Sequence, residues 1–164
     1  IKYGYKGDCS VTPYVDWRTS LGYLPNSHGV DYSHHPSSPY RIYSKEDKDR
    51  YLIEVPVSIR KIKRFMESHD EEGETIWLRP KRNNLDKMLH LVDILVNGSA
   101  QYLEFVIHSS ELMPGASPTF KTTEDIEKLY DDLEVLFDYI SRYCYGSTFR
   151  NSMEFLEKIS AIDN

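Results

Sequence analysis

The chain has 164 residues, of which 40% are hydrophobic and 28% charged, and its formal net charge is −6. This size and composition predict one globular domain, residues 1–164, with a sizeable core. The acidic balance argues against nucleic acid and anionic membranes as partners, and no apolar run is long enough to predict a membrane span. The location stays open between the cytoplasm and the cell envelope.

The first fifty residues contain little regular periodicity. The opening IKYGYKGDCS predicts a strand that runs into a loop near Asp8. Residues 11–50 are rich in Pro, Ser, Gly, Asn, His and Tyr and predict a long functional loop, with YRIY (40–43) as a short strand inside it. The neighbouring His34 and His35 indicate a solvated loop, because adjacent histidines rarely bind one metal ion.

The middle of the chain predicts short elements. YLIEVPVSI (51–59) is typical of a strand that Pro56 confines to an edge or an end. RKIKRFMES (60–68) predicts a short helix, and TIWL (75–78) predicts another strand.

The remaining chain has clearer helical signals. Asn84 and Gly98 are the capping residues of a predicted helix between them, and QYLEFVIH (101–108) predicts a strand. The further expected elements are a long helix from Thr122 or Thr123 to Gly146, a short strand STF (147–149), and a final helix with Asn151 and Glu154 as a capping box.

Alternation of strands and helices predicts a parallel α/β sheet or barrel, in which functional groups gather at the carboxyl ends of strands. Asp8, Ser58 and His108 occupy three such ends. A carboxylate beside an imidazole raises its pKa and suits a general acid, so Asp8 and His108 are a candidate pair. The alternative is two unrelated polar groups at strand ends.

The loop segment TPYVDW (12–17) contains Tyr14, Asp16 and Trp17. An indole or phenol ring in a loop can stack on the apolar face of a sugar. The alternative for Trp17 is a hydrophobic plug beneath the long loop.

Four stretches, in order, resemble the C-terminal half of a bacterial polysaccharide deacetylase, a family-four carbohydrate esterase of the kind associated with cell-surface polysaccharides. They are GYKGDCSVTPYVDW (4–17), LIEVPVSI (52–59), IWLRP (76–80) and EFVIHSSELMPGASPTF (104–120). The resemblance implies a partial distorted (β/α) barrel with mostly parallel strands and crossover helices. It also implies metal-dependent removal of acetyl from an N-acetylated sugar of a polysaccharide or oligosaccharide.

The resemblance assigns roles to individual residues. His108 resembles the general acid, and either Asp8 or Asp16 resembles the carboxylate that orients it. Trp17, Val106 and Ile107 resemble walls of the acetyl pocket, with Tyr14 beside Trp17 as a further substrate-binding residue.

The metal-binding motifs of that family, T-F-D-D and H-x-x-x-H, do not occur in the chain. The sequence therefore predicts no metal ligand here, although the complete enzyme would use a zinc-like divalent ion. Without metal and base, the chain alone is expected to be inactive. The alternatives are a catalytically dead carbohydrate-binding or scaffolding module, and a glycosidase using Asp16 and Glu111. The exposed edges of half a barrel would favour a homo-oligomer.

Overall fold

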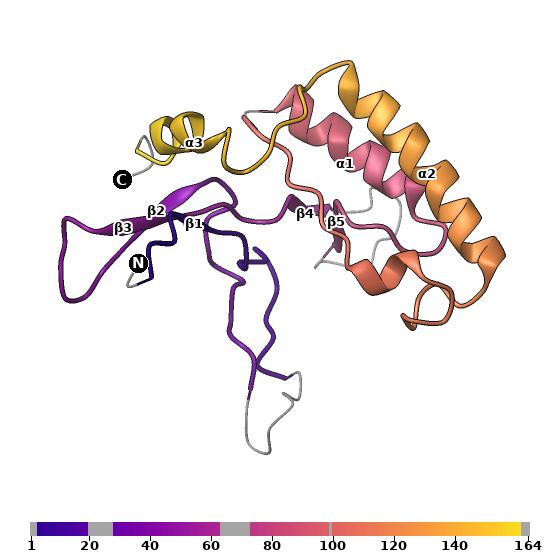
Figure 1. Cartoon of the computed structure of the whole chain (residues 1–164), viewed down its shortest axis with the longest axis horizontal. Coiled ribbons are helices and arrows are strands. Elements are labelled where there is room, and N and C mark those ends of the chain that lie inside the picture. The colour runs from indigo at the N-terminus through magenta and orange to yellow at the C-terminus, as the bar shows by residue number, and fades with distance from the viewer. Residues whose placement is uncertain (1–2, 20–27, 63–72, 99, 162–164) are drawn as a thin grey trace. The chain divides into compact units, whose positions relative to one another are not determined.

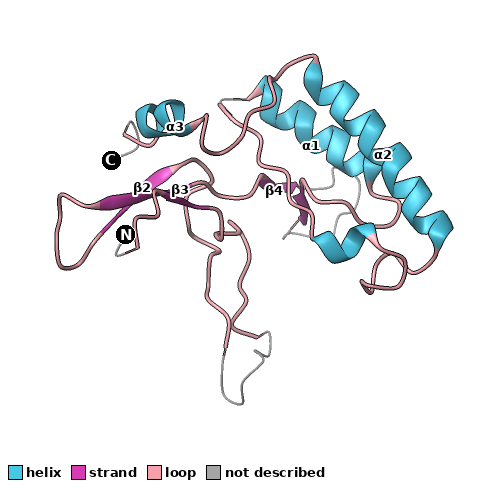
Figure 2. Cartoon of the chain, viewed as in Figure 1, coloured by secondary structure: helices cyan, strands magenta, loops and turns pink. Residues whose placement is uncertain are grey.

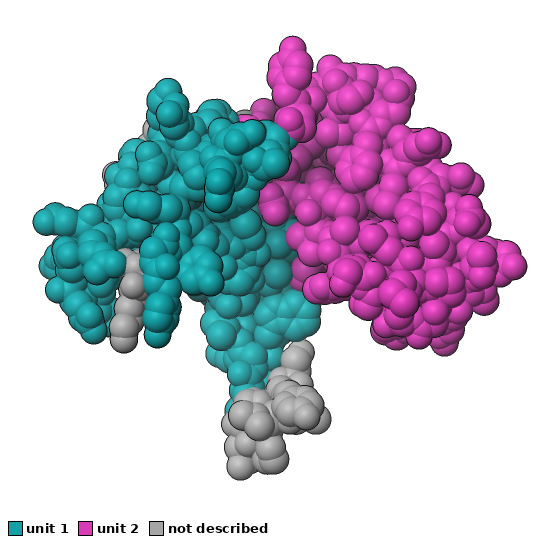
Figure 3. Space-filling model, viewed as in Figure 1, with its two compact units in different colours: residues 1–75, 147–164 teal, residues 76–146 magenta. Residues whose placement is uncertain are grey.

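The computed structural model describes residues 3–19, 28–62, 73–98 and 100–161. The chain divides into two compact units, drawn in separate colours in Figure 3. Residues 1–75 and 147–164 make up the first unit, and residues 76–146 make up the second. Each is described by itself below.

The first unit is organised around a three-stranded mixed sheet (Figure 1). Its strands are β1 (Gly7–Asp8), β2 (Tyr40–Tyr43) and β3 (Tyr51–Glu54), in the order β1-β3-β2. The central strand β3 pairs in parallel with β1 and antiparallel with β2, so that its last residue, Glu54, has Asp8 on one side and Tyr40 on the other.

The strand expected at residues 40–43 is confirmed as β2. It forms a hairpin with β3, and the Ser44 amide donates to the Arg50 carbonyl at 2.8 Å where the turn closes. Tyr43 and Tyr51 face each other across the hairpin with ring centroids 5.8 Å apart. Such cross-strand aromatic pairs stabilise a short sheet.

The strand expected at residues 51–59 ends earlier, at Glu54. Beyond it the chain still follows the N-terminal segment, because Val55 N–H donates to the Asp8 carbonyl and Val57 N–H donates to the Val11 carbonyl. Pro56 has no N–H to contribute to a regular ladder, which accounts for the early end of the strand.

The helix α3 (Met153–Ile159) completes the first unit and buries Leu156 and Ile159. Its start is close to the expected one, although Ser152 rather than Asn151 is the capping residue. The strand expected at residues 147–149 is not formed, since those residues lead into turns.

A second, two-stranded antiparallel sheet joins β4 (Ile59–Ile62) and β5 (Glu74–Trp77). The strand expected around residues 75–78 is thereby confirmed. The helix expected at 60–68 is wrong for residues 60–62, and residues 63–68 lie outside the described ranges. Burial of the β-branched Ile59 and the strand preference of β-branched residues favour extended backbone here.

The second unit contains α1 (Leu85–Asn97) and α2 (Thr123–Ser141), which pack against each other (Figure 2). Both starts agree with the sequence: Asn84 precedes α1, and Thr122 forms a capping box with Asp125 at α2. Helix α2 ends at Ser141 rather than continuing to Gly146. The buried faces consist of apolar residues at helical spacing: Met88, Leu91, Val92 and Leu95 on α1, and Ile126, Leu129 and Leu136 on α2.

The strand expected at residues 101–108 is not formed. The segment forms a backbone bond from Val106 N–H to the Leu78 carbonyl at 3.1 Å, but no regular ladder. A short 3₁₀ helix, η1 (Ser109–Leu112), follows it. Side-chain packing fixes the segment instead, with Phe105 against Phe137 and Ile107 against a cluster of Phe120, Ile126 and Leu129.

The expectation of a partial (β/α) barrel is wrong. A parallel sheet needs a crossover between neighbouring strands, and helices usually supply it. In the described ranges β2 and β3 instead form a hairpin, and α1, α2 and α3 all follow the last strand. This succession of strands and then helices is an α+β arrangement. The argument for a homo-oligomer rested on cut barrel edges and loses that basis.

Of the helices in the described ranges, none is both long and apolar enough to cross a membrane. In the described ranges Cys9 and Cys144 form no disulfide, and both are half-buried.

Candidate functional site

A buried acid holds the loop that follows β1. Glu54 is completely inaccessible to solvent, and its Oε1 accepts a hydrogen bond from Val11 N–H at 2.9 Å. Its other oxygen, Oε2, is buried without a hydrogen-bond partner among the described residues. We call residues 9–17 the anchored loop, because the hydrogen bond from Val11 N–H to Glu54 holds it in place. Buried carboxyl oxygens are rarely left without a hydrogen-bond partner, as Oε2 is here.

The surroundings of Glu54 favour its protonated form. Burial raises the pKa of Glu54 to about 7, the Val11 N–H bond opposes this change, and the neighbouring Asp8 carboxylate reinforces it. A protonated carboxyl gains an O–H donor, for which Asp8 supplies an acceptor. Glu54 can therefore hold a proton near neutral pH.

Asp8 is the exposed member of this acid pair. Its Oδ1 accepts from Cys9 N–H at 3.0 Å, and its Oδ2 accepts from the Ser10 hydroxyl at 2.8 Å. These bonds fix the carboxylate at the start of the anchored loop, where a bound molecule can reach it. The sequence singled out Asp8, and the structure adds the buried acid beside it.

Tyr40 borders Glu54 on the β2 side. Burial raises the pKa of Tyr40 to about 12, with the charge of Glu54 as a further cause, so the phenol keeps its proton. Its hydroxyl lies 3.0 Å from His35 Nδ1, and the ring of His35 meets that of Tyr32 edge to face at 5.1 Å. Tyr40, on the strand next to Glu54, is thus linked by its hydroxyl to His35 in the long loop.

Asp16 has a different environment. Its Oδ2 lies 2.7 Å from an Arg18 guanidinium nitrogen that also meets Asp31 at 3.0 Å. The hydrogen bonds from Arg18 lower the pKa of Asp16 to about 2. A carboxylate so weakly basic is a permanent anion and a poor proton acceptor, and Arg18 already occupies it.

The anchored loop presents two aromatic rings. Trp17 is half-buried, and its indole N–H donates to the Thr12 hydroxyl at 2.7 Å. Tyr14 is 36% exposed and has a φ of 67°, in the left-handed region that bulky residues avoid. Such strain persists where the surrounding structure imposes it, and it is frequent at ligand-binding positions.

Two backbone bonds close the base of this loop against residues 30–32. Trp17 N–H donates to the Val30 carbonyl at 3.0 Å, and Tyr32 N–H donates to the Val15 carbonyl at 2.9 Å. Gly29 makes the approach possible, because a Cβ there would lie 2.4 Å from the Trp17 carbonyl oxygen.

His108 belongs to the second unit and is exposed. Its backbone N–H donates to Glu111 Oε2 at 2.9 Å, and Glu111 Oε1 receives Arg79 at 2.8 Å. Glu111 is 3% exposed. Both of its oxygens are occupied, which removes the basis for treating it as a glycosidase carboxylate.

Val106 and Ile107 are half-buried in the second unit, and Ile107 packs on the apolar cluster described above. The structure thus gathers Asp8, Tyr14, Asp16 and Trp17 in one unit, and Val106, Ile107 and His108 in the other. The pairing of His108 with Asp8 or Asp16 stays a prediction.

Sequence reasoning missed Glu54 as a functional residue. The signal was present, since one acid interrupts the apolar stretch LIEVPV, and a charged residue in a buried strand is rare without a partner. Tyr40 and His35 gave no comparable signal, because their contact depends on the hairpin.

No three His, Cys, Asp or Glu side chains of the described ranges converge to hold a metal ion. These residues do not fit the metal centre of a deacetylase, and we derive no chemical step through one. Comparison of the chain with family models, with curated proteins and with solved structures gave no match.

Proposed function

We propose that the chain is a carbohydrate-binding part of a polysaccharide deacetylase, and that alone it binds N-acetylated glycans without hydrolysing them. The observation that carries the proposal is the strained, exposed Tyr14 on a loop anchored by a buried acid. That loop lies within GYKGDCSVTPYVDW, one of the most specific stretches of the resemblance.

The contacts between the resembling stretches support the proposal. In the first unit, residues 4–17 pair with residues 52–59 through β1 and β3. In the second unit, residues 76–80 contact residues 104–120 through the Arg79–Glu111 ion pair and the Val106–Leu78 backbone bond. Within each unit, each of these stretches thus has another of them as its neighbour.

The chemistry available to the chain is proton transfer and sugar binding. Cleavage of an acetamide requires protonation of the departing amine, which an exposed imidazole such as His108 can supply. It also requires an activated water, for which the described residues provide no metal. Tyr14 and Trp17 offer ring faces for the C–H groups of a sugar.

Binding is the first test. Chitin oligomers are titrated into the chain, and the tryptophan fluorescence and the amide shifts of residues 12 and 14–17 are followed. We expect saturable binding that Trp17→Ala and Tyr14→Ala each weaken at least about tenfold. Tyr145→Ala is the matched control, because Tyr145 is a fully exposed aromatic outside the loop. Equal losses in all three variants, or no binding at all, would refute the proposal.

Acetate release is the second test. It distinguishes a part of a deacetylase that is inactive alone from a chain that is an active enzyme by itself. With zinc, nickel or cobalt added, we expect no acetate from chitin oligomers. Release that disappears in His108→Ala would show that the chain is active alone. Recovery of activity on adding a polypeptide that carries the missing metal motifs, and its loss in His108→Ala, would distinguish the deacetylase from a dead binding module.

A further inference from the structure

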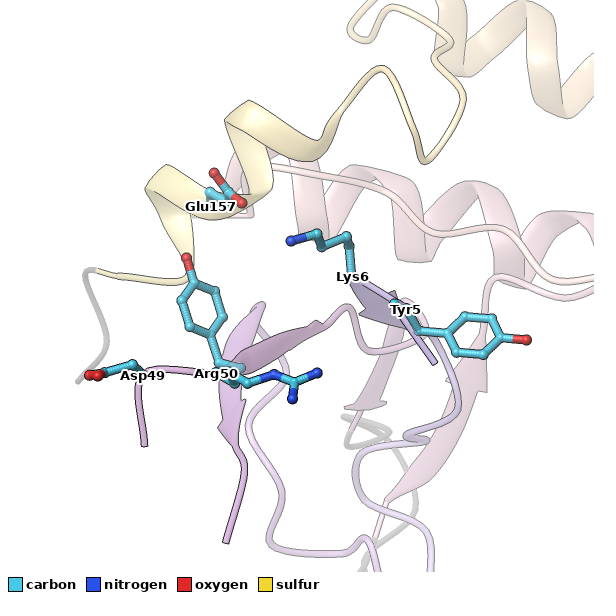
Figure 4. A pocket seen from close by; sticks show the side chains of 7 residues that line it. Tyr5, Lys6, Asp49, Arg50 and Glu157 are labelled. Atoms are coloured by element: carbon cyan, nitrogen blue, oxygen red, sulfur yellow. The ribbon is translucent and has the colours of Figure 1, made fainter. Parts of the chain in front are cut away.

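A pocket of about 230 Å³ lies in the first unit, between the N-terminal segment, the β2–β3 turn and α3 (Figure 4). Glycine, aromatic and charged residues line it: Gly4, Tyr5, Lys6, Asp49, Arg50, Tyr51 and Glu157. Nothing in the sequence analysis pointed to it, because its walls come from three distant parts of the chain.

The charged side chains that line the pocket do not all point into it. In Figure 4 the Lys6 ammonium and the Arg50 guanidinium extend toward the same space, while the Asp49 carboxylate points away from it. Glu157 borders that space from α3. Two cations and one carboxylate therefore face a ligand, and the excess positive charge favours an anion.

The aromatic wall of the pocket is held in place. The Arg41 guanidinium lies 4.5 Å from the centroid of the Tyr51 ring, and Tyr43 packs near the same ring. Arg41 also donates to the Glu157 backbone carbonyl at 3.2 Å, which ties α3 to the hairpin. Its Nε is buried without a hydrogen-bond partner among the described residues. This fixed wall reduces the ordering cost of binding.

We propose that this pocket binds a single sugar residue that carries a carboxylate, a uronic acid unit of a polysaccharide. Its volume is below the range of roughly 300 Å³ upward that drug-sized ligands occupy, so it suits one ring rather than an oligomer. Arg50 and Lys6 bind the carboxylate, and the Tyr51 phenol and Glu157 bind the ring and its hydroxyls. The choice of a sugar rests on the proposed function, whereas the choice of an anion rests on the pocket alone.

The test is an NMR titration of the full chain with glucuronate, in which the amide shifts of Lys6 and Tyr51 report binding. Glucose is the neutral match, acetate is the carboxylate without a ring, and inorganic phosphate is the competing anion. We expect glucuronate to bind at least about tenfold more tightly than any of these. Lys6→Gln and Arg50→Gln should each weaken it about tenfold. Lys48→Gln is the control: it removes one positive charge from the β2–β3 turn that also contains Arg50, but Lys48 does not line the pocket, so glucuronate binding should be unchanged.

Each contrary result has a distinct meaning. Equal affinity for glucose, or for acetate and phosphate, would overturn the uronate assignment, as would equal effects of Lys6→Gln and Lys48→Gln. Chitin binding at Trp17 without glucuronate binding would overturn the pocket inference and leave the proposed function standing. Glucuronate binding without chitin binding would overturn the proposed function and keep the pocket. Amide spectra of the variants show that they remain folded.

Discussion

Among the described residues, each unit buries one glutamate, and the surroundings of the two glutamates differ. Glu111 in the second unit has an arginine on one oxygen and a backbone N–H on the other. Glu54 in the first unit accepts from a backbone N–H with one oxygen, whereas its other oxygen is buried without a hydrogen-bond partner among the described residues, and the Asp8 carboxylate is a neighbour.

The difference decides what each acid can do. A buried carboxyl group whose two oxygens are held by an arginine and a backbone N–H organises its surroundings, so Glu111 is a positioning residue for the backbone of His108. A buried carboxylate beside a second carboxylate takes up a proton instead, so Glu54 is suited to hold and release one.

The largest effect is expected from Arg79→Met, which removes the cation that pairs with the buried Glu111 carboxyl group. Breaking one side of a buried pair costs about 3–5 kcal/mol of unfolding free energy, measured by urea denaturation. Arg82→Met is the control, because the Arg82–Asp125 pair has a 63% exposed arginine and should contribute less than about 1 kcal/mol. Equal losses of unfolding free energy in the two variants would mean that the buried Arg79–Glu111 pair stabilises the fold no more than an exposed pair does.

The next effect is the pH dependence caused by Glu54. Its raised pKa means that the folded state binds the proton more tightly than the unfolded chain, whose value is 4.5. The stabilisation is complete below about pH 4.5 and is lost as the pH rises through about 7, a fall of about 3 kcal/mol.

Glu54→Gln tests this directly, since the amide imitates the neutral acid. The variant should match the wild type in acid and exceed it in unfolding free energy above about pH 7, by about 3 kcal/mol. Glu46→Gln, at an exposed position in the β2–β3 turn, is the control and should follow the wild-type curve. Parallel curves for all three proteins would show that Glu54 is ionised when folded.

A smaller effect is expected from Gly7→Ala. A Cβ at this position would lie 2.3 Å from the Phe149 ring and 3.2 Å from the Ile53 carbonyl oxygen, so either the Phe149 ring or β1 must shift. Such overpacking costs about 1–3 kcal/mol. Because β1 holds Asp8 beside Glu54, we also expect the pH midpoint of the Glu54 transition to move toward its ordinary value. Gly146→Ala, where the added methyl meets open space, should do neither.

How far the sequence determined these features depends on the range of the interactions. The helices α1 and α2 could be predicted because their signals are local: Asn84 and Gly98 flank α1, and Thr122 caps the first turn of α2. The barrel could not be excluded from sequence, because parallel and antiparallel pairing have the same local preferences. The prediction of a strand at 101–108 was wrong for a related reason, because a strand forms only where the backbone of another strand can pair with it.

The site divides in the same way. Asp8, Tyr14 and Trp17 were identifiable because they share one short stretch of sequence, whereas the acid pair depends on the register between β1 and β3. A shift of one residue would place Glu54 on the other face of the sheet, so its contact with Asp8 is a property of the fold.

The smallest effect on stability and a large one on binding are expected from Tyr14→Asn. Asparagine tolerates the left-handed φ of 67° better than a bulky ring does, so the variant should gain about 1 kcal/mol of unfolding free energy. If Tyr14 is held in this conformation to contact a sugar, the same variant should lose chitin binding at least about tenfold.

Asn83 has a φ of 56° in a turn of the second unit, and Asn83→Gly is the control. It relieves similar backbone strain without changing the anchored loop. A Tyr14→Asn variant that is more stable and binds chitin as well as the wild type would separate the strain from the ligand. The aromatic ring at position 14 would then have no part in sugar binding.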